Sequence, residues 1–241
     1  MSDSPSKLYS QFASWWPLLS DPADYKEEAQ FFYDLLKAAA KYPFESLHEF
    51  GAGGGNLASH LKTRLRLTLS DRSPEMLAVC RSLNPECEHI VADMRTARLD
   101  RQFDAVLIHD AIMYITSEPE LGQTLETAWI HCRPGGIALF SPDFIRETFS
   151  ETTSHGGHGQ GERALRYLEW ACDPDPSDTQ YSVFFVYVLR DGASSRVESE
   201  EHSLGLFPRQ VWLDRLRDVG FIPKIVRDPS NRDVFLCEKP G

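Results

Sequence analysis

A glycine-rich turn between a predicted strand and a predicted helix is the segment of this sequence best suited to binding a ligand. It runs Leu47-His-Glu-Phe-Gly-Ala-Gly-Gly-Gly-Asn56, with glycine at positions 51, 53, 54 and 55. Glycine lets the backbone turn tightly and lets a ligand reach main-chain N–H groups at the start of a helix. These residues alone leave two interpretations open, a nucleotide-binding loop or a tight turn without a ligand.

The residue before the first glycine decides between ligand classes. Glu49 would repel a pyrophosphate on this loop and attract a cation. The dinucleotide fingerprint G-x-G-x-x-G also fails, because Asn56 stands where its last glycine is needed. S-adenosylmethionine carries an ammonium and a sulfonium and no phosphate, so it suits this loop better than a dinucleotide does.

Composition narrows the partners and the compartment. The sequence has 36 acidic and 25 basic residues, a net charge of −11, which argues against nucleic acid as a partner. No apolar run approaches the ~18 residues of a membrane span, and the N-terminus lacks the apolar stretch of a signal peptide. We therefore expect a cytoplasmic protein without membrane association. The five cysteines are scattered and His155-Gly-Gly-His158 lacks further ligands, so no metal site is expected.

Short apolar runs alternate with helical stretches in the first part of the chain. Strands are predicted at 46–50, 65–70, 89–92, 103–109 and 136–140, and helices at 56–61, 74–81 and 118–131. This alternation is typical of a doubly wound parallel sheet. The preceding segment, 1–44, is predicted to be helical, with a helix over 21–41.

The pattern changes after Pro142. Residues 147–161 are rich in Ser, Thr, Gly and His, which predicts a surface loop, whereas 164–172, 180–190 and 195–206 read as strands of antiparallel hairpins. A helix at 208–219 and strands at 221–227 and 233–238 follow. We therefore predict one domain, 1–241, with an inserted antiparallel β subdomain and lid at 143–207.

The turn around Glu49 resembles the first motif of the class I S-adenosylmethionine-dependent methyltransferases, acidic-x-G-x-G-x-G. Further landmarks resemble that family in order: Asp71 in Ser70-Asp-Arg-Ser-Pro-Glu-Met76, the pair Asp93-Met94, the run 103–115, and Arg133-Pro-Gly-Gly136. The resemblance covers about residues 45–141 and 208–238. It implies an α/β fold with a Rossmann-like, seven-stranded, mostly parallel sheet, a C-terminal antiparallel hairpin, and an inserted antiparallel sheet after the fifth strand.

The same resemblance implies a set of cofactor-binding residues. Asp71 would hold the ribose hydroxyls, while Asp93 and Met94 would meet the adenine. The full set is Glu49, Gly51, Ala52, Gly53, Asp71, Arg72, Met76, Asp93, Met94 and His109. Taken singly, the aspartates could be ordinary turn residues and the methionines core residues. Both aspartates follow strands at the edge where open α/β sheets bind ligands, which favours the functional interpretation.

Methyl transfer needs chiefly a nucleophile held behind an activated methyl group, so a base is not strictly required. If there is one, His109 at the end of the fourth strand is the first candidate, although such a histidine often only hydrogen-bonds a loop. Tyr114 and Asp110 are weaker candidates on the same edge.

The acceptor pocket is expected to come from 143–207. Tyr167, Glu169, Trp170 and Tyr187 would suit an uncharged or cationic small molecule with an apolar body. The layout is similar to small-molecule N-methyltransferases, including those that dimethylate amino sugars, so an amine or hydroxyl acceptor is expected. The aromatic segment from Tyr9 to Pro17 is a second possible source of acceptor contacts.

Two other function classes share features with this sequence. A nicotinamide-dependent reductase would need Tyr-x-x-x-Lys after the glycine loop, but that spacing occurs only at Tyr33 to Lys37, before it. A non-enzymatic or inactive S-adenosylmethionine-binding protein would use the same cofactor residues. Both a monomer and a homodimer are compatible with the sequence.

Overall fold

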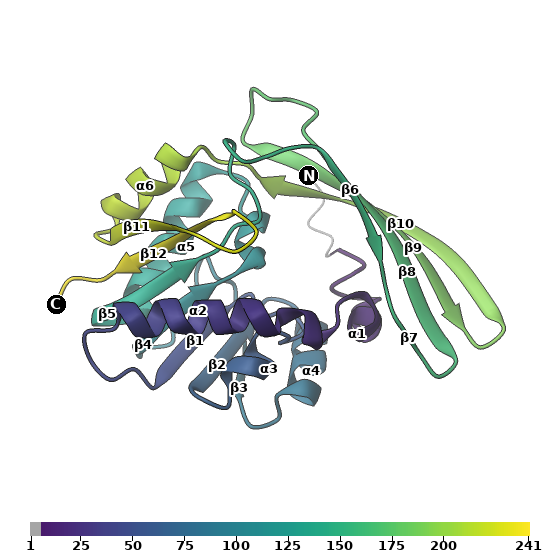
Figure 1. The fold of residues 1–241 in the computed structure, drawn as a ribbon, viewed down its shortest axis with the longest axis horizontal. Helices are drawn as coiled ribbons and strands as arrows, with labels where there is room; N and C mark the ends of the chain where they lie inside the picture. The colour runs from purple at the N-terminus through teal and green to yellow at the C-terminus, as the bar shows by residue number, and fades with distance from the viewer. Residues whose placement is uncertain (1–5) are drawn as a thin grey trace.

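Two β-sheets organise the computed structural model, which describes residues 6–241 (Figure 1). Within those residues the first sheet has seven strands in the order β11-β12-β5-β4-β1-β2-β3. Their bounds are β1 Ser46–Phe50, β2 Arg66–Asp71, β3 Glu88–Val91, β4 Phe103–Ile108, β5 Cys132–Phe140, β11 Ile222–Arg227 and β12 Asp233–Glu238. The strands β1 to β5 are parallel to one another, and β12 is antiparallel to both β5 and β11. The predicted Rossmann-like sheet with a C-terminal hairpin is confirmed.

The central strands are buried on both faces, which explains their continuous apolar runs. In β4, Ala105 and Leu107 pack on one side, and Val106 and Ile108 pack on the other. One face is covered by α2 (Lys26–Ala39), α3 (Ala58–Leu61) and α4 (Pro74–Leu83), the other by α5 (Glu118–His131) and α6 (Arg209–Asp218). This sandwich fixes the carboxyl ends of the parallel strands at one edge.

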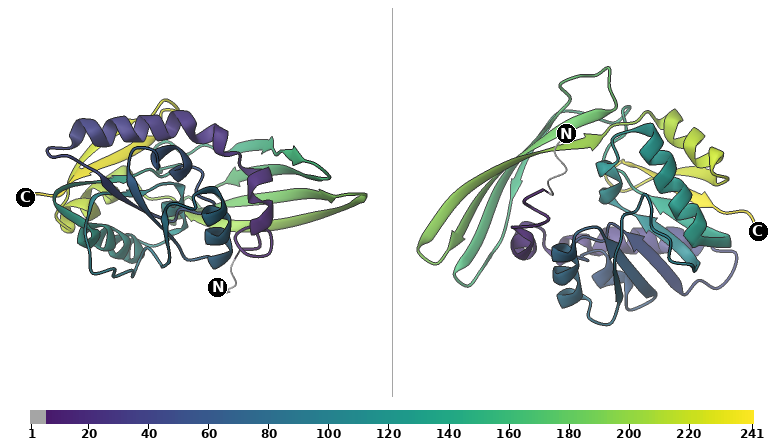
Figure 2. Two further views of the ribbon diagram at one scale, coloured as in Figure 1. Left: turned by 90° about the horizontal axis from the view of Figure 1, so that it is seen from below. Right: turned by 180° about the vertical axis from the view of Figure 1, so that it is seen from behind.

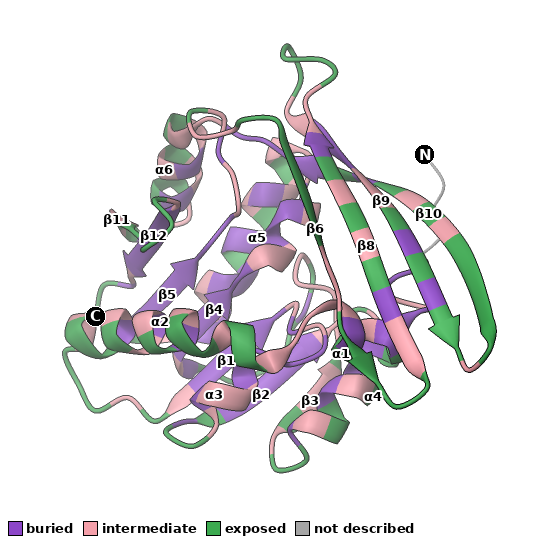
Figure 3. Cartoon of the chain, turned by 45° about the vertical axis from the view of Figure 1, so that its right-hand side comes forward, coloured by how far each residue is buried: buried purple, intermediate pink, exposed green. Residues whose placement is uncertain are grey.

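The second sheet is antiparallel and stands beside that edge (Figure 2). Its strands are β6 Thr152–Gly156, β7 Gly159–Gln160, β8 Arg163–Cys172, β9 Gln180–Asp191 and β10 Ser194–Gly205, in the order β10-β9-β8-β6 with β7 also paired to β8. Exposed and buried residues alternate along β8, β9 and β10, so the sheet has an inward and an outward face (Figure 3).

The prediction of a loop over 147–161 is wrong for the residues that form β6 and β7. Residues Thr152–Gly156 form β6, an edge strand paired with β8 from Thr152↔Ala171 to Gly156↔Tyr167. Main-chain pairing with an exposed neighbour needs no apolar side chains, so composition gave no sign of it.

The N-terminal segment crosses from the second sheet to the first. A short turn η1 (Ala13–Trp15), a short helix α1 (Trp16–Leu19) and a turn η2 (Pro22–Tyr25) precede α2, so the helix predicted from residue 21 begins only at Lys26. Leu8, Phe12 and Leu18 pack against the inward face of the second sheet. The first five residues of the predicted 1–44 segment lie outside the described residues. No helix within 6–241 combines the length and hydrophobicity of a membrane span.

Candidate active site

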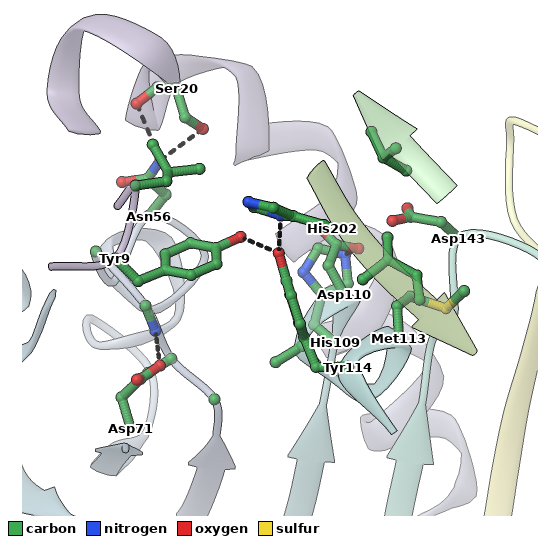
Figure 4. A pocket seen from close by; sticks show the side chains of 18 of the residues that line it. Tyr9, Ser20, Asn56, Asp71, His109, Asp110, Met113, Tyr114, Asp143 and His202 are labelled. Carbon is green, nitrogen blue, oxygen red and sulfur yellow. Dashed lines mark hydrogen bonds and ion pairs between the residues drawn. The ribbon is translucent and has the colours of Figure 1, made fainter. Parts of the chain in front are cut away.

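A cavity of about 700 Å³ lies between the carboxyl edge of the first sheet and the inward face of the second (Figure 4). One wall is the glycine loop and the ends of β1, β2 and β4, and another is β8, β9 and β10. The N-terminal segment from Leu8 to Tyr25 forms a third wall. Segments that are far apart in the sequence therefore meet around one space.

The glycine loop turns at the end of β1 as predicted. Gly51 has φ of 69°, and a Cβ there would lie 2.2 Å from Cβ of Ala111, so both the turn and the close approach of the next loop need glycine. Gly53 has φ of 53°, and its N–H donates to Oδ2 of Asp71 at 2.9 Å. Gly51, Ala52 and Gly53 all line the cavity.

Glu49 is a buried carboxyl group on the cavity wall. It is 3% exposed, and its Oε2 has no hydrogen-bond partner among the described residues. Burial raises its pKa to about 7, against the opposing effect of His109. A buried acidic oxygen without a partner, beside a glycine turn, is the feature expected where a cationic ligand binds.

Asp71 and Asp93 also reach the cavity, together with Arg72 and Met94. Asp71 accepts hydrogen bonds from the backbone N–H groups of Gly53 and Ser73, and burial raises its pKa. The Asp93 carboxylate is already paired with Arg95, whose Nη2 lies 2.7 Å from Oδ2 and whose hydrogen bonds lower the Asp93 pKa. The sequence interpretation did not include this arginine.

Met76 does not belong to the cavity wall. It is fully buried on the inward face of α4, and its Cε lies 3.7 Å from the position a Cβ would take at Gly53. Its prediction as a direct cofactor contact is wrong, because the helix carries it beneath the loop. Met76 instead supports the glycine loop from the core.

His109 lies between two carboxylates and is poorly placed to act as a base. Its Nε2 is 2.8 Å from Oδ1 of Asp110 and 3.1 Å from Oε1 of Glu28 in α2. Burial alone would lower its pKa, but these two acidic groups outweigh burial and hold the pKa well above its usual value. A side chain that already carries its proton near neutral pH cannot accept another one.

Arg232, in the turn between β11 and β12, completes this charged cluster. It forms ion pairs with Glu28, with Asp228 at 2.6 Å and with Asp143 at 3.1 Å. Burial and the neighbouring Asp110 raise the pKa of Asp143 to about 8. The C-terminal hairpin is thereby connected to the ends of β4 and β5. Nothing in the spacing of these residues along the sequence indicated the cluster.

Tyr114 takes part in a hydrogen-bonded chain across the cavity (Figure 4). Its hydroxyl lies 2.7 Å from the Tyr9 hydroxyl and 2.7 Å from Nδ1 of His202. Nε2 of His202 is in turn 3.3 Å from Oε1 of Glu200. Burial raises the pKa of both tyrosines, so both phenols stay protonated near neutral pH. This chain leads from the cavity to a carboxylate on the second sheet.

The N-terminal segment is fastened on three sides. The backbone N–H groups of Lys7 and Leu8 donate to the Glu200 carboxylate at 2.8 and 3.1 Å. Ser73, at the start of α4, donates to the carbonyl of Tyr9 at 2.6 Å, and Asn56 donates to the carbonyl of Ser20 at 3.1 Å. Tyr9 is therefore held between the two sheets. The sequence predicts this aromatic segment as a possible source of acceptor contacts, but it does not indicate these hydrogen bonds.

The predicted acceptor residues of β8 lie on two different faces of the second sheet. Tyr167 and Glu169 point inward and line the cavity, whereas Trp170 is 39% exposed and lies on the outward face. The assignment of Trp170 to the pocket is wrong, because neighbouring residues of a strand point to opposite faces. Tyr187 faces inward but is buried, and its hydroxyl donates to Glu200 at 3.2 Å.

Comparisons with known proteins agree with this geometry. A methyltransferase domain family matches residues 48–136. A dTDP-3-amino-3,4,6-trideoxy-alpha-D-glucopyranose N,N-dimethyltransferase from Streptomyces venezuelae is 29% identical over 218 residues, which cover 88% of this chain and 90% of that protein. The matched domain and this relative assign S-adenosylmethionine-dependent methyl transfer to the chain.

Solved structures show the same fold for the methyltransferase along its whole length. The sugar N-methyltransferase KedS8 from Streptoalloteichus has a TM-score of 0.84 at 21% identity, covering 100% of this chain and 96% of that chain. The amino pentose methyltransferase CalS10 from Micromonospora echinaspora, solved with S-adenosylmethionine bound, has a TM-score of 0.79 at 20% identity, covering 99% of each chain. The second sheet is thus part of a shared architecture.

The cavity of the methyltransferase fits S-adenosylmethionine. The unpartnered oxygen of Glu49 offers an acceptor to a positive charge, and Gly51, Ala52 and Gly53 of the loop line the cavity with it. The Asp71 carboxylate keeps acceptor capacity beyond its two backbone hydrogen bonds, because a carboxylate has about four lone-pair sites. These features favour a cationic nucleoside over a pyrophosphate-containing dinucleotide.

We predict that the affinity of the methyltransferase for S-adenosylmethionine rises as the pH rises through about 7 and levels off above about pH 8. Only the ionised form of Glu49 attracts a cation, and its pKa in the free protein is about 7. A drop of roughly tenfold in affinity between pH 8 and pH 6 is expected. Calorimetry across this range checks it. In Glu49→Gln the pH dependence should flatten; a slope as steep as that of the original protein would assign it to another group.

Proposed function

We propose that this methyltransferase transfers methyl groups to the amino group of a small molecule of the amino-sugar class. The names of the relatives support an amine on a sugar as the acceptor. The observation that carries the proposal is the carboxylate of Glu169, which faces the cavity from the inward face of β8. A hydroxyl acceptor would have less need of such a negative charge.

Glu169 is available to an incoming ligand. Its carboxylate has no hydrogen-bond partner among the described residues, and burial raises its pKa, with His202 opposing this effect. Tyr167, Tyr181 and Phe185 surround it on the same face of the sheet. Aromatic rings around a single carboxylate are suited to a cationic amine on a largely apolar body, or to the ring of a deoxygenated sugar.

We further propose that the cofactor is held by Glu49, Gly51, Ala52, Gly53, Asp71, Arg72, Asp93 and Met94. When bound, S-adenosylmethionine supplies a methyl group activated by a positively charged sulfur. The protein would use Asp71 to hold the ribose hydroxyls and Met94 to pack against the adenine. Backbone groups of the glycine loop and Glu49 would orient the charged end. His109 would support this end through Glu28 and Asp110 without removing a proton.

The chain of Tyr114 and His202 provides the route for the acceptor's proton. An amine attacks only as the neutral form with a free lone pair, so an ammonium must first lose a proton. The Tyr114 hydroxyl faces the cavity and can pass a proton to Nδ1 of His202 as it receives one from the amine. Glu200 stabilises the resulting imidazolium. Proton uptake in this proposal therefore falls to His202 through Tyr114 and not to His109.

We predict that Glu169→Gln raises the KM for an amino-sugar acceptor by about tenfold or more. The substitution removes one charge-assisted contact, worth ~1.5–3 kcal/mol, and keeps the shape of the side chain. Steady-state kinetics with a dTDP-linked 3-amino sugar measures it. The Kd for S-adenosylmethionine should change by less than about twofold.

Glu162→Gln is the matched control, because Glu162 is an exposed carboxylate in the tight turn between β7 and β8 and is absent from the cavity lining. Its kinetics should equal those of the unmodified protein. If Glu169→Gln leaves the acceptor KM unchanged, the amine is held elsewhere. If no amine in a panel is methylated while hydroxyl compounds are, the proposal of an N-methyltransferase is overturned.

A further inference from the structure

The outward face of the second sheet concentrates exposed apolar side chains. Leu168, Trp170, Val186, Val188 and Val197 are between 39% and 67% exposed. The strand registers place them side by side: Val197 is opposite Val188, Val186 is opposite Leu168, and Phe184 is opposite Trp170. Large exposed apolar residues elsewhere, such as Val91 and Ile222, are isolated. A continuous apolar band on a soluble domain marks an interaction surface.

No described element covers this band. In Figures 1 and 2 the second sheet projects away from the α/β body, and α1 with the N-terminal segment lies against its other face. The cavity lies on that inward face too, so the outward face takes no part in the site described above. The inward apolar face of the sheet is packed against the rest of the chain, whereas the outward apolar face has no packing partner among the described residues.

Charges at the two ends of the band select its partner. Exposed Arg190 lies at one end, and exposed Glu201 and Glu151 lie towards the other. Exposed Arg166 lies beside Val188, one row in from the Arg190 end. Six residues of β9 separate the row of Arg190 from the row of Phe184 and Glu201, which is about 20 Å along the strand. The face is therefore apolar at its centre, positive at one end and negative at the other.

We infer that this face binds the same face of a second copy of the chain, in a two-fold symmetric sandwich with antiparallel β9 strands. A two-fold axis running across the strands brings the Arg190 end of one copy to the Glu201 end of its partner, and Val186 and Val188 lie near the axis. An axis along the strands would instead bring like charges together, which is unfavourable. The pattern is thus complementary to itself in one orientation only.

Sedimentation equilibrium of the full chain tests the inference. The unmodified protein should be a dimer at micromolar concentration. Val186→Glu places a charge at the centre of the interface and should raise the dimer Kd at least 100-fold. Ile222→Glu, at an exposed apolar residue on β11 away from the band, should leave the dimer intact. Circular dichroism and S-adenosylmethionine affinity report whether each variant is folded.

Charge reversal tests the orientation. Glu201→Arg alone should weaken the dimer about tenfold or more, because it meets Arg190 of the partner. The double variant Arg190→Glu/Glu201→Arg should restore most of the lost affinity. A monomeric unmodified protein at 100 μM, or a folded Val186→Glu variant that stays dimeric, overturns the interface. A double variant weaker than Glu201→Arg overturns the antiparallel orientation.

Discussion

Asp71→Ala is expected to raise the Kd for S-adenosylmethionine by about 100-fold or more. The carboxylate would lose two charge-assisted hydrogen bonds to the ribose, each worth ~1.5–3 kcal/mol, and its hold on the Gly53 N–H would be lost as well. Asp71→Asn keeps an acceptor for the Gly53 N–H and removes the charge. Its Kd should therefore lie between those of the unmodified protein and Asp71→Ala. Calorimetry at pH 8 gives the three dissociation constants.

The control for this series is Asp34→Ala, which removes an exposed carboxylate on α2. It should bind the cofactor like the unmodified protein. If a folded Asp71→Ala variant keeps the original Kd, the ribose is held at another strand end and the assignment of the β2 edge is incorrect.

His202→Phe is expected to lower kcat for the amine acceptor by roughly 100-fold, within the 10²–10⁴ range of a lost general base. The aromatic ring preserves packing against Tyr9 and Phe185, so cofactor affinity should change little. Initial-rate measurements at saturating cofactor and acceptor give kcat. The loss should shrink at high pH, where the acceptor amine is already neutral in solution.

Tyr114→Phe interrupts the same chain one link earlier. It should cause a comparable loss, and the double variant Tyr114→Phe/His202→Phe should lose no more than the worse single variant, because both remove one function. Losses that multiply in the double variant, or a His202→Phe enzyme with unchanged kcat, would show that the protein does not take up the proton by this route.

Features set by local sequence were predictable. The glycine loop and the alternation of β1 to β5 with helices depend on residues close in the chain, and they identified the cofactor edge of the sheet. Asp71 and Asp93 could be predicted because they stand at or just after the ends of β2 and β3, where open α/β sheets bind ligands. The error at Met76 has the same origin, because its motif position was known but the direction of its side chain from α4 was not.

Features set by contacts between distant segments were not predictable. Glu28, Asp110 and Arg232 come from α2, the end of β4 and the C-terminal hairpin, and their meeting reversed the role expected for His109. Alternation along β10 could have placed Glu200 and His202 on one face. Only the fold shows that this face meets Tyr114.

Tyr9 connects the N-terminal segment with the proposed proton route. The same side chain forms part of the cavity wall and is a hydrogen-bond partner of Tyr114, which contacts His202. Any displacement of this segment wide enough to exchange a nucleoside separates Tyr9 from Tyr114. On the proposed proton route, such a separation would take one hydrogen-bond partner from the Tyr114 hydroxyl and leave its contact with His202. The position of the N-terminal segment would then change the acidity of the very hydroxyl that hands on the acceptor's proton.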